Sequence, residues 1–346
     1  MHMNIYELKE KFDLQNQFQV LADSYKQVEY AWNNEFDLMH LKDSKYNLVL
    51  LAGMGGSAIS GDLISDFLVD ELRIPFIVNR SYSLPDFVDE NSLVIISSYS
   101  GNTEETLSVF EEALKTKCKI AAITSGGRVK KICDEKKLCC INIPIGYQPR
   151  YALGLGFFSL LNLLQQLGIV ENQDSIVNQI SSLWKKKGQE YSIEENKALS
   201  LALELTGFLP IIYSAAQHTS AAGYRFKCQL NENSKIHAFS NVIPEMNHNE
   251  IIGWETFEEK KLFTKVITIA DPDYHPQIKK RFKITSEIAK QSGVEIINIE
   301  SKEKNRKVRL FDLIYLCDWI SYYLALLRNH DPSEIAYIDE LKNRLT

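Results

Sequence analysis

The chain has 346 residues, about twice the length of a typical single domain, which predicts two domains. Its hydrophobic content of 45% is that of a globular protein and excludes a disordered chain. The 39 basic and 45 acidic residues give a net charge of −6, which argues against a protein that binds nucleic acid through bulk positive charge. An anionic small molecule would have to bind through local donors.

Neither the cysteines nor the N-terminus indicates an exported or zinc-binding protein. The six cysteines form no CxxC pair and no zinc-ribbon spacing, so we expect buried free thiols in a reducing compartment. Residues 1–30 lack the apolar core of a signal peptide. The longest apolar run, Phe311 to Leu327, is interrupted by Asp312 and Asp318, which suits a buried helix better than a membrane span. These features predict a cytoplasmic protein that binds neither membranes nor nucleic acid.

Short apolar runs alternate with helical patterns in the first half of the chain. Such runs suit central parallel strands that are buried on both faces. The predicted strands are Tyr46–Ala52, Phe76–Val78, Leu93–Ser97, Ile120–Thr124 and Cys140–Ile143. The predicted helices include Thr103–Lys115, Arg128–Lys136 and Tyr151–Leu167. This alternation predicts a doubly wound α/β domain.

The composition turns polar between residues 168 and 197, and we place the domain boundary there, with domains at 1–170 and 171–346. The alternation then resumes. The predicted strands are Leu209–Ser214, Lys265–Ala270 and Val294–Ile299, and the predicted helices are Thr219–Asn231, Ile278–Gln291 and Phe311–Arg328. The sequence therefore predicts two α/β domains, each a parallel sheet flanked by helices.

A glycine-rich loop at residues 53–58 follows the first buried strand and opens a helix. It fits the G-x-G-x-x-A dinucleotide fingerprint, although the second strand ends without the expected carboxylate, at Arg80, which would suit the 2′-phosphate of NADP. Alternatively, Gly55 and Gly56 let the backbone approach a phosphate, and Ser57 supplies a hydroxyl at a helix N-terminus. A plain strand–helix turn that binds nothing is the third interpretation.

A second loop favours a phosphate monoester over a dinucleotide. Ser98, Ser100 and Thr103 surround Gly101 at the end of the third predicted strand, where a helix begins. Helix capping would explain one of these hydroxyls but not all of them. A third loop of the same kind follows the next strand at Thr124–Gly127. All these loops lie at the carboxyl ends of strands, where open α/β sheets bind ligands.

These loops are similar to those of a known domain. The segments GMGGSAISGD, SSYSGNTEET and ITSGG resemble the phosphate loops of sugar isomerase (SIS) domains. The resemblance implies two SIS-type domains, with the phosphate of a sugar held in the first of them. The residues that it assigns to phosphate binding are Gly55, Gly56, Ser57, Ser98, Ser100 and Thr103.

Three later segments narrow the resemblance to bifunctional phosphoglucose/phosphomannose isomerases. They match the patterns P-x-G-x-x-P-R-x-A-x-G, N-E-N-x-K and P-E-x-N-H-N-E at residues 144–154, 231–235 and 244–250. The family interconverts glucose 6-phosphate, and mannose 6-phosphate, with fructose 6-phosphate through a cis-enediol, without metal or cofactor. The resemblance therefore implies an intramolecular oxidoreductase that acts on a sugar phosphate.

The resemblance also assigns catalytic roles. Glu232 would be the base, Arg150 would stabilise the enediolate, and His248 and Lys342 would open the sugar ring. In the family the histidine reaches the site of the neighbouring subunit, which implies a homodimer. No group of His, Cys, Asp and Glu has metal spacing, and the H-x-E at His248 lacks the P-C-x-x-C of zinc deaminases.

Each of these residues also has a simpler interpretation. Glu232 lies near the end of the predicted helix Thr219–Asn231, where the negative end of the helix dipole makes a carboxylate a better proton acceptor, but it could be an exposed loop glutamate. His248 could be a surface histidine, Arg150 a surface arginine in an ion pair, and Lys342 a solvated lysine of the last helix. Two other functions also stay open: a non-catalytic sugar-phosphate sensor and an NADP-dependent oxidoreductase.

Overall fold

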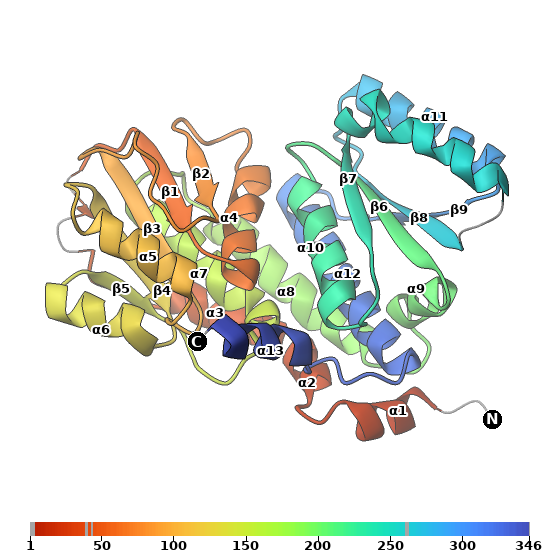
Figure 1. Cartoon of the computed structure of the whole chain (residues 1–346), viewed down its shortest axis with the longest axis horizontal. Coiled ribbons are helices and arrows are strands. Elements are labelled where there is room, and N and C mark those ends of the chain that lie inside the picture. The colour runs from red at the N-terminus through yellow and green to blue at the C-terminus, as the bar shows by residue number, and fades with distance from the viewer. Residues whose placement is uncertain (1–3, 39–40, 43, 260–262, 346) are drawn as a thin grey trace. The chain divides into compact units, whose positions relative to one another are not determined.

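The structure is a computed structural model that describes residues 4–38, 41–42, 44–259 and 263–345. It consists of two compact units (Figure 1). One unit is Ser24–Ser182, and the other combines Met1–Asp23 with Leu183–Thr346. The chain passes from the first unit to the second within helix α8 (Asp174–Tyr191), whereas the predicted boundary lay shortly before this helix.

The unit Ser24–Ser182 is built on five parallel strands in the order β2-β1-β3-β4-β5. The strands are β1 (Leu48–Ala52), β2 (Phe76–Asn79), β3 (Ser92–Ser98), β4 (Lys119–Thr124) and β5 (Cys139–Asn142). Every residue of β1 and β3 is buried, which explains their continuous apolar sequences. The predicted doubly wound fold is confirmed.

Helices cover both faces of this sheet (Figure 1). They are α3 (Ser24–Asn33), α4 (Gly55–Phe67), α5 (Glu104–Ala113), α6 (Gly127–Lys136) and α7 (Leu153–Gln166). α4 packs against α7 and α7 against α3, while α5 and α6 pack on β1, β3, β4 and β5. Right-handed crossovers explain this arrangement, because β1–α4–β2 winds in one direction and the later units wind in the other.

The second unit has a four-stranded parallel sheet in the order β7-β6-β8-β9. Its strands are β6 (Leu209–Ala215), β7 (Phe239–Ile243), β8 (Thr264–Ala270) and β9 (Glu295–Glu300). Strand β7 was not predicted from the sequence. It lies at the edge of the sheet and only Ile243 is buried, so it lacks the apolar run that marks a central strand.

A long apolar helix organises the second unit. The remaining helices are α9 (Lys197–Leu205), α10 (Ser220–Glu232), α11 (Pro276–Gln291), α12 (Arg306–Leu327) and α13 (Ala336–Leu345), with 3₁₀ segments η3 (Glu245–His248) and η4 (Glu250–Glu259). α12 packs against α9 and α10. It is long and apolar enough to cross a membrane, but 89% of its apolar window is buried inside the protein, as in the core helix of a soluble protein.

The first residues of the chain belong to this second unit because they pack on α12. Helices α1 (Ile5–Phe12) and α2 (Gln17–Ala22) both contact it. Between them, the Asp13 carboxylate accepts hydrogen bonds from the Phe18 amide (2.8 Å) and from the Tyr322 hydroxyl of α12 (2.9 Å). One buried carboxylate therefore starts α2 and ties it to the core helix.

Candidate functional site

The strand order puts the first two glycine loops next to each other. β1 and β3 are neighbours, and the chain leaves β1 toward one side of the sheet and β3 toward the other. In sheets of this order, ligands bind at the carboxyl ends of the strands, at the point where the winding direction changes. The loops at residues 53–57 and 98–103 flank this switch point.

The first loop is shaped to approach its neighbours closely. Gly55 has a φ of +47°, a conformation that glycine adopts at little cost. A Cβ on Gly56 would lie 2.8 Å from the Pro149 carbonyl oxygen, so only glycine fits there without a shift. The Ser57 hydroxyl accepts a hydrogen bond from the Tyr99 amide (3.2 Å). The loop is thereby fixed against both the second loop and the segment that carries Arg150.

The second loop gathers hydroxyls that do not serve as helix caps. Ser98 is buried, and its hydroxyl lies 2.9 Å from that of Thr103 and accepts the Gly101 amide at 3.1 Å. Thr103 is the N-cap residue of α5, yet its side chain makes no capping hydrogen bond. Ser100 is exposed at the tip of the loop. Capping of α5 therefore does not explain these hydroxyls, and their role in phosphate binding stays a prediction.

The third loop is pressed against the second. Gly101 has a φ of +68°, and a Cβ there would lie 1.8 Å from the carbonyl oxygen of Gly126. The Ser125 amide donates to the Tyr99 carbonyl at 3.0 Å, and the Val129 amide donates to the Gly101 carbonyl at 3.0 Å. The loops after β1, β3 and β4 thus form one connected block of backbone.

Arg150 is held beside this block. It lies in the 3₁₀ segment η2 (Pro149–Tyr151) and is only 4% exposed, which contradicts the interpretation as a surface arginine. The segment before it is fixed by Tyr99, whose hydroxyl donates to the Pro144 carbonyl (3.0 Å) and accepts the Tyr147 amide (2.9 Å). Burial raises the pKa of Tyr99, so its hydroxyl keeps the proton that it donates.

Tyr99 was missed by the sequence analysis. It stands between two serines that were chosen for their hydroxyls, and nothing in the sequence marks its role. It connects all parts of the site: its backbone contacts the first and third loops, and its side chain fixes the segment before Arg150.

The cation that would favour NADP is already engaged. Arg80 follows β2 and forms an ion pair with Asp62 on α4. The pKa of Asp62 is raised above its usual value because burial outweighs the opposing effects of the hydrogen bond and the charge of Arg80. An arginine committed to a neighbouring carboxylate is a poor partner for a ribose 2′-phosphate, which weakens the dinucleotide interpretation.

Glu232 is the last residue of α10 and is half-buried. The flanking asparagines hold the backbone around it. The Asn231 side chain donates to the Ile236 carbonyl (2.8 Å), and the buried Asn233 donates to the Ser321 hydroxyl of α12 (2.9 Å). The carboxylate is therefore carried on a helix end that is fixed on two sides.

His248 closes η3 and is exposed. The segment that carries it is anchored on both sides. The Asn247 amide donates to the Thr285 hydroxyl of α11 (2.8 Å), and the Glu250 carboxylate accepts the Tyr213 hydroxyl of β6 (2.7 Å). The histidine is thus presented outward on a fixed segment.

The structure does not bring Glu232 and His248 together. Helix α10 returns from the carboxyl end of β6 to the amino end of β7, so Glu232 lies near the start of β7. His248 follows the other end of this strand. β7 has five residues, and the rise of an extended chain separates its first and last residues by about 13 Å. Glu232 and His248 therefore lie near opposite ends of this strand.

Lys342 lies in α13, a helix with no buried residue. The structure thus groups the six candidate phosphate-binding residues with Arg150 in one unit, and it carries Glu232, His248 and Lys342 on separate elements of the other.

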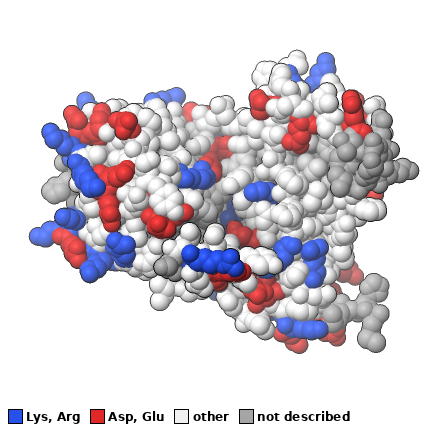
Figure 2. Space-filling view, viewed as in Figure 1, with Lys and Arg blue, Asp and Glu red and all other residues white. Residues whose placement is uncertain are grey.

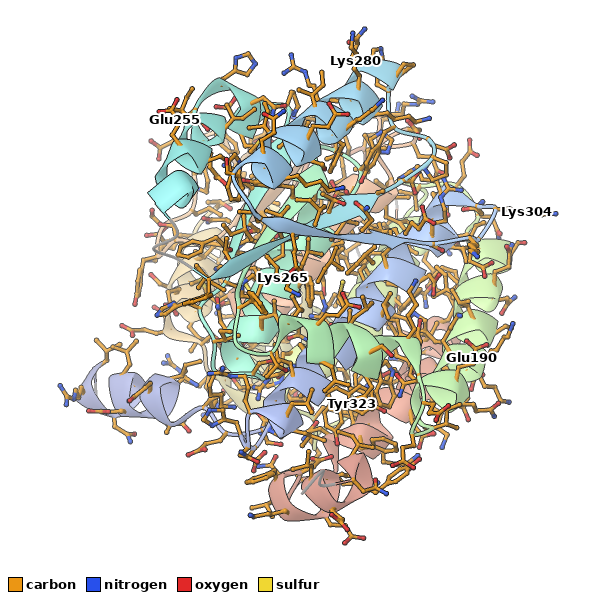
Figure 3. All side chains as sticks on the ribbon, turned by 90° about the vertical axis from the view of Figure 1, so that its right-hand side faces the viewer. Glu190, Glu255, Lys265, Lys280, Lys304 and Tyr323 are labelled. Carbon is orange, nitrogen blue, oxygen red and sulfur yellow. The ribbon has the colours of Figure 1, made fainter. Side chains whose placement is uncertain are left out.

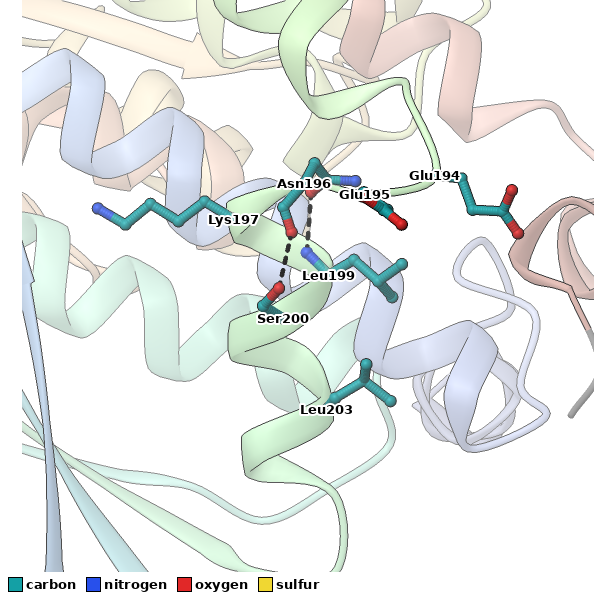
Figure 4. Close-up of a pocket in the computed structure, with 7 residues that line it drawn as sticks. All are labelled: Glu194, Glu195, Asn196, Lys197, Leu199, Ser200 and Leu203. Atoms are coloured by element: carbon teal, nitrogen blue, oxygen red, sulfur yellow. Dashed lines mark hydrogen bonds between the residues drawn. The ribbon is translucent and has the colours of Figure 1, made fainter.

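A hollow elsewhere on the protein has a structural explanation. It lies at the start of α9 (Figure 4) and is lined by Glu194, Glu195, Asn196, Lys197, Leu199, Ser200 and Leu203. The Asn196 side chain accepts the Leu199 amide (2.9 Å), and the Ser200 hydroxyl donates to the Asn196 carbonyl (3.1 Å). These polar groups start the helix.

Charged side chains of both signs are interspersed over the visible face (Figure 2). In the described part of the chain, no group of three or more His, Cys, Asp and Glu residues is arranged to hold a metal ion.

Comparison with known proteins identifies the family. A model of the bacterial phospho-glucose isomerase C-terminal SIS domain matches residues 194–345. A bifunctional phosphoglucose/phosphomannose isomerase of Caldicellulosiruptor bescii is 41% identical over 89% of this chain and 92% of its own. One from Aquifex aeolicus is 35% identical over 94% of this chain and 99% of its own.

The fold has solved relatives as well. A hypothetical protein from Thermus thermophilus superimposes with a TM-score of 0.75 at 16% identity, covering 98% of this chain and 92% of its own. Both predictions, of the SIS-type fold and of the family, are confirmed. The chain belongs to the family of bifunctional phosphoglucose/phosphomannose isomerases.

Proposed function

We propose that this protein interconverts glucose 6-phosphate, and also mannose 6-phosphate, with fructose 6-phosphate. The observation that carries the proposal is the switch point between β1 and β3, where Ser57, Ser98, Ser100 and Thr103 gather beside two helix N-termini and the buried Arg150. A dianionic phosphate fits such a site, because hydroxyls and free amides donate to it without a cluster of cations. The names of the relatives support the same substrates.

In the proposed reaction, Glu232 is the base. It removes the proton from C2 of the open-chain aldose, and the electrons of that C–H bond form a C1–C2 double bond. The carbonyl oxygen at C1 becomes negatively charged, and the Arg150 guanidinium stabilises it in the enediolate. Glu232 then returns the proton to C1, and the hydroxyl proton at O2 moves to O1, which leaves the ketose.

His248 and Lys342 open the pyranose ring by moving protons between the ring oxygen and the C1 hydroxyl. Because Glu232 and His248 lie near opposite ends of strand β7, we place His248 in the site of a neighbouring subunit. The protein then acts as a homodimer. This arrangement explains why an exposed histidine is held on a fixed segment.

The reaction consumes no external oxidant, because C1 is reduced as C2 is oxidised within one molecule. It therefore needs no redox cofactor, and the enediolate charge is met by Arg150 rather than by a metal ion. Sugar phosphates of this kind are cytoplasmic metabolites, and we assign the protein to the cytoplasm, where its six cysteines stay free.

A coupled assay tests the proposal. The purified protein is given fructose 6-phosphate or mannose 6-phosphate, with and without EDTA, beside the variants Glu232→Gln and Glu204→Gln. Glu204 is an exposed glutamate of α9 in the same unit. We expect Glu232→Gln to lower kcat about 10²–10⁴-fold, the usual contribution of a general base. Glu204→Gln should keep full activity, and EDTA should have no effect.

Each rival function predicts a different result. A non-catalytic sensor would bind the sugar phosphates without turnover. An NADP-dependent enzyme would require the nucleotide and change its absorbance. Full activity in Glu232→Gln would remove the base assignment while leaving the isomerase intact.

A further inference from the structure

Cationic side chains gather at the C-terminal end of α10, next to Glu232. The last carbonyls of a helix have no partner within the helix. Here the Lys235 ammonium donates to the carbonyls of Glu232 (2.9 Å) and Asn233 (3.2 Å). The Arg328 guanidinium, from the end of α12, donates to the next carbonyl, that of Ser234 (2.8 Å). Two cationic side chains thus donate hydrogen bonds to three successive carbonyls, beginning with that of the proposed base.

The Lys235 ammonium also reaches a distant segment. Its third hydrogen bond goes to the carbonyl of Asp331 at 2.6 Å, in the chain that leads from α12 to α13. The three donors of the ammonium therefore meet three carbonyls, two on the helix end and one across from it. This single side chain ties the end of α10 to the C-terminal segment.

The backbone conformation of Lys235 also indicates that its side chain stabilises the end of α10. Its φ of +52° lies in the left-handed region, which costs a non-glycine residue about 1–2 kcal/mol. A glycine would adopt this conformation without that cost, but it would leave the carbonyls of Glu232, Asn233 and Asp331 without the ammonium. The side chain of Lys235 therefore offsets the strain of its own backbone.

The other side of the helix end is bound to α12. The Ser234 hydroxyl donates to the Ser321 carbonyl at 2.7 Å, beside the bond from Asn233 to the Ser321 hydroxyl. One turn earlier, Gln229 donates to the buried Asp318 at 2.9 Å. Asn233 and Ser234 are fully buried. Lys235 supplies the contacts to the carbonyls of Glu232 and Asn233 at this helix end, where Glu232 is partly exposed.

We propose that Lys235 is a positioning residue for Glu232, acting through the backbone carbonyls of the helix end. The proposal rests on the role of Glu232 as base. Helix ends fray, and a base that must meet a C–H bond loses about 10²-fold in rate when misplaced by about 1 Å. By holding the carbonyl of Glu232 and the one after it, Lys235 keeps this residue in helical conformation. It touches no substrate in this role.

The test compares Lys235→Gly, Lys235→Met and Lys235→Arg in the full-length protein, with fructose 6-phosphate as substrate. Lys235→Gly removes the ammonium and also relieves the strained backbone, so it should fold even where Lys235→Met does not. We expect both to lower kcat about 10–100-fold while KM changes less than about threefold. Lys235→Arg should recover most of the lost kcat, because a guanidinium also donates to several carbonyls.

Lys265→Met is the matched control. Lys265, labelled in Figure 3, lies on β8 in the same unit. It is 7% exposed, pairs with Glu295 at 2.7 Å and lies over the ring of Phe208. Its loss should lower the melting temperature without lowering kcat. The proposal is overturned if folded Lys235→Gly keeps the wild-type kcat, or if Lys265→Met lowers kcat as much.

Glu232→Gln, measured beside these variants, separates the two proposals. An active Glu232→Gln contradicts the base assignment on which this inference rests. An inactive Glu232→Gln together with a fully active Lys235→Gly contradicts the positioning role alone.

Discussion

The first four strands of each sheet follow the same order, yet the switch points of the two sheets carry different residues. At the switch point of the five-stranded sheet, the loops after β1 and β3 carry glycines and hydroxyls at the starts of α4 and α5. The four-stranded sheet has the equivalent switch point between β6 and β8, and it is filled. Tyr274 is 3% exposed there, its hydroxyl donates to the Ile269 carbonyl (2.9 Å), and it contacts the hydroxyl of Thr219.

Other side chains pack around Tyr274 at this switch point. The Thr219 hydroxyl also accepts the Ala215 amide at 3.1 Å, and the Tyr274 ring stacks on Phe282 with 5.5 Å between centroids. Beside them, Asp271 pairs with Arg309 of α12 at 2.7 Å. At this switch point the polar groups bond to a buried tyrosine and to an arginine of α12, whereas at the first one the hydroxyls of Ser57 and Ser98 bond to backbone amides of glycine-rich loops.

The difference shows that a shared fold does not imply a shared site. In the first unit, glycines stand beside the candidate phosphate-binding hydroxyls at the switch point. In the second, a buried tyrosine lies at the switch point, and the proposed catalytic residues lie on other parts of the unit. The following predictions test this contrast between the two switch points.

The largest effect is expected at the filled switch point. Tyr274→Ala removes a buried ring, which should lower the free energy of unfolding by about 3–5 kcal/mol. The KM for fructose 6-phosphate should stay within about twofold, because the residues proposed to hold phosphate belong to the other unit. Denaturant unfolding followed by tryptophan fluorescence measures the loss, since Trp184, Trp254 and Trp319 all lie in this unit.

Tyr337→Ala is the control for this prediction. Tyr337 is 88% exposed in the same unit, so its loss should change the free energy of unfolding by less than about 0.5 kcal/mol. A large rise in KM for Tyr274→Ala would mean that the filled switch point contributes to sugar-phosphate binding, and would remove the contrast.

A smaller effect is expected at the contact between the second and third loops. Gly101→Ala introduces a Cβ 1.8 Å from the Gly126 oxygen at a φ of +68°, so the second and third loops must separate. We expect a loss of about 3 kcal/mol in unfolding free energy. The KM should rise at least about tenfold, which corresponds to 1.4 kcal/mol in binding. Calorimetry and steady-state kinetics measure the two quantities.

Gly168→Ala separates backbone strain from collision. Gly168 has a φ of +70° in the same unit, but its Cβ would meet nothing within 4 Å. Strain alone should cost about 1 kcal/mol and leave the KM unchanged. If both variants behave alike, the close approach of the loops has no role in binding.

The smallest effect is expected from one hydroxyl. Ser98→Ala removes the partner of Thr103 and of the Gly101 amide, which should cost about 1 kcal/mol in stability and raise the KM about five- to tenfold. In Ser159→Ala, a buried hydroxyl with no hydrogen-bond partner in the described part of the chain is lost, so both quantities should stay as in wild type. An unchanged KM in Ser98→Ala would argue against its role in phosphate binding.

Much of this site could be predicted because its chemistry is local. Gly55, Gly56 and Ser57 come shortly after a buried strand, and a glycine-rich turn between a strand and a helix is typical of a phosphate-binding loop. The central strands were predicted for a similar reason, since burial on both faces leaves a continuous apolar run. Strand β7 was not predicted, because an edge strand with a single buried residue has no such run.

The class of fold, the strand–loop–helix units that present the phosphate-binding candidates, and the family could all be inferred from the sequence. Each of these depends on residues that are neighbours along the chain. The packing of the chain was needed to show that Tyr99 joins the loops to the segment of Arg150, that Arg80 pairs with Asp62, and that Lys235 ties the helix end of Glu232 to the segment after α12. These contacts join separate elements, and which side chains meet there depends on how the helices and strands pack.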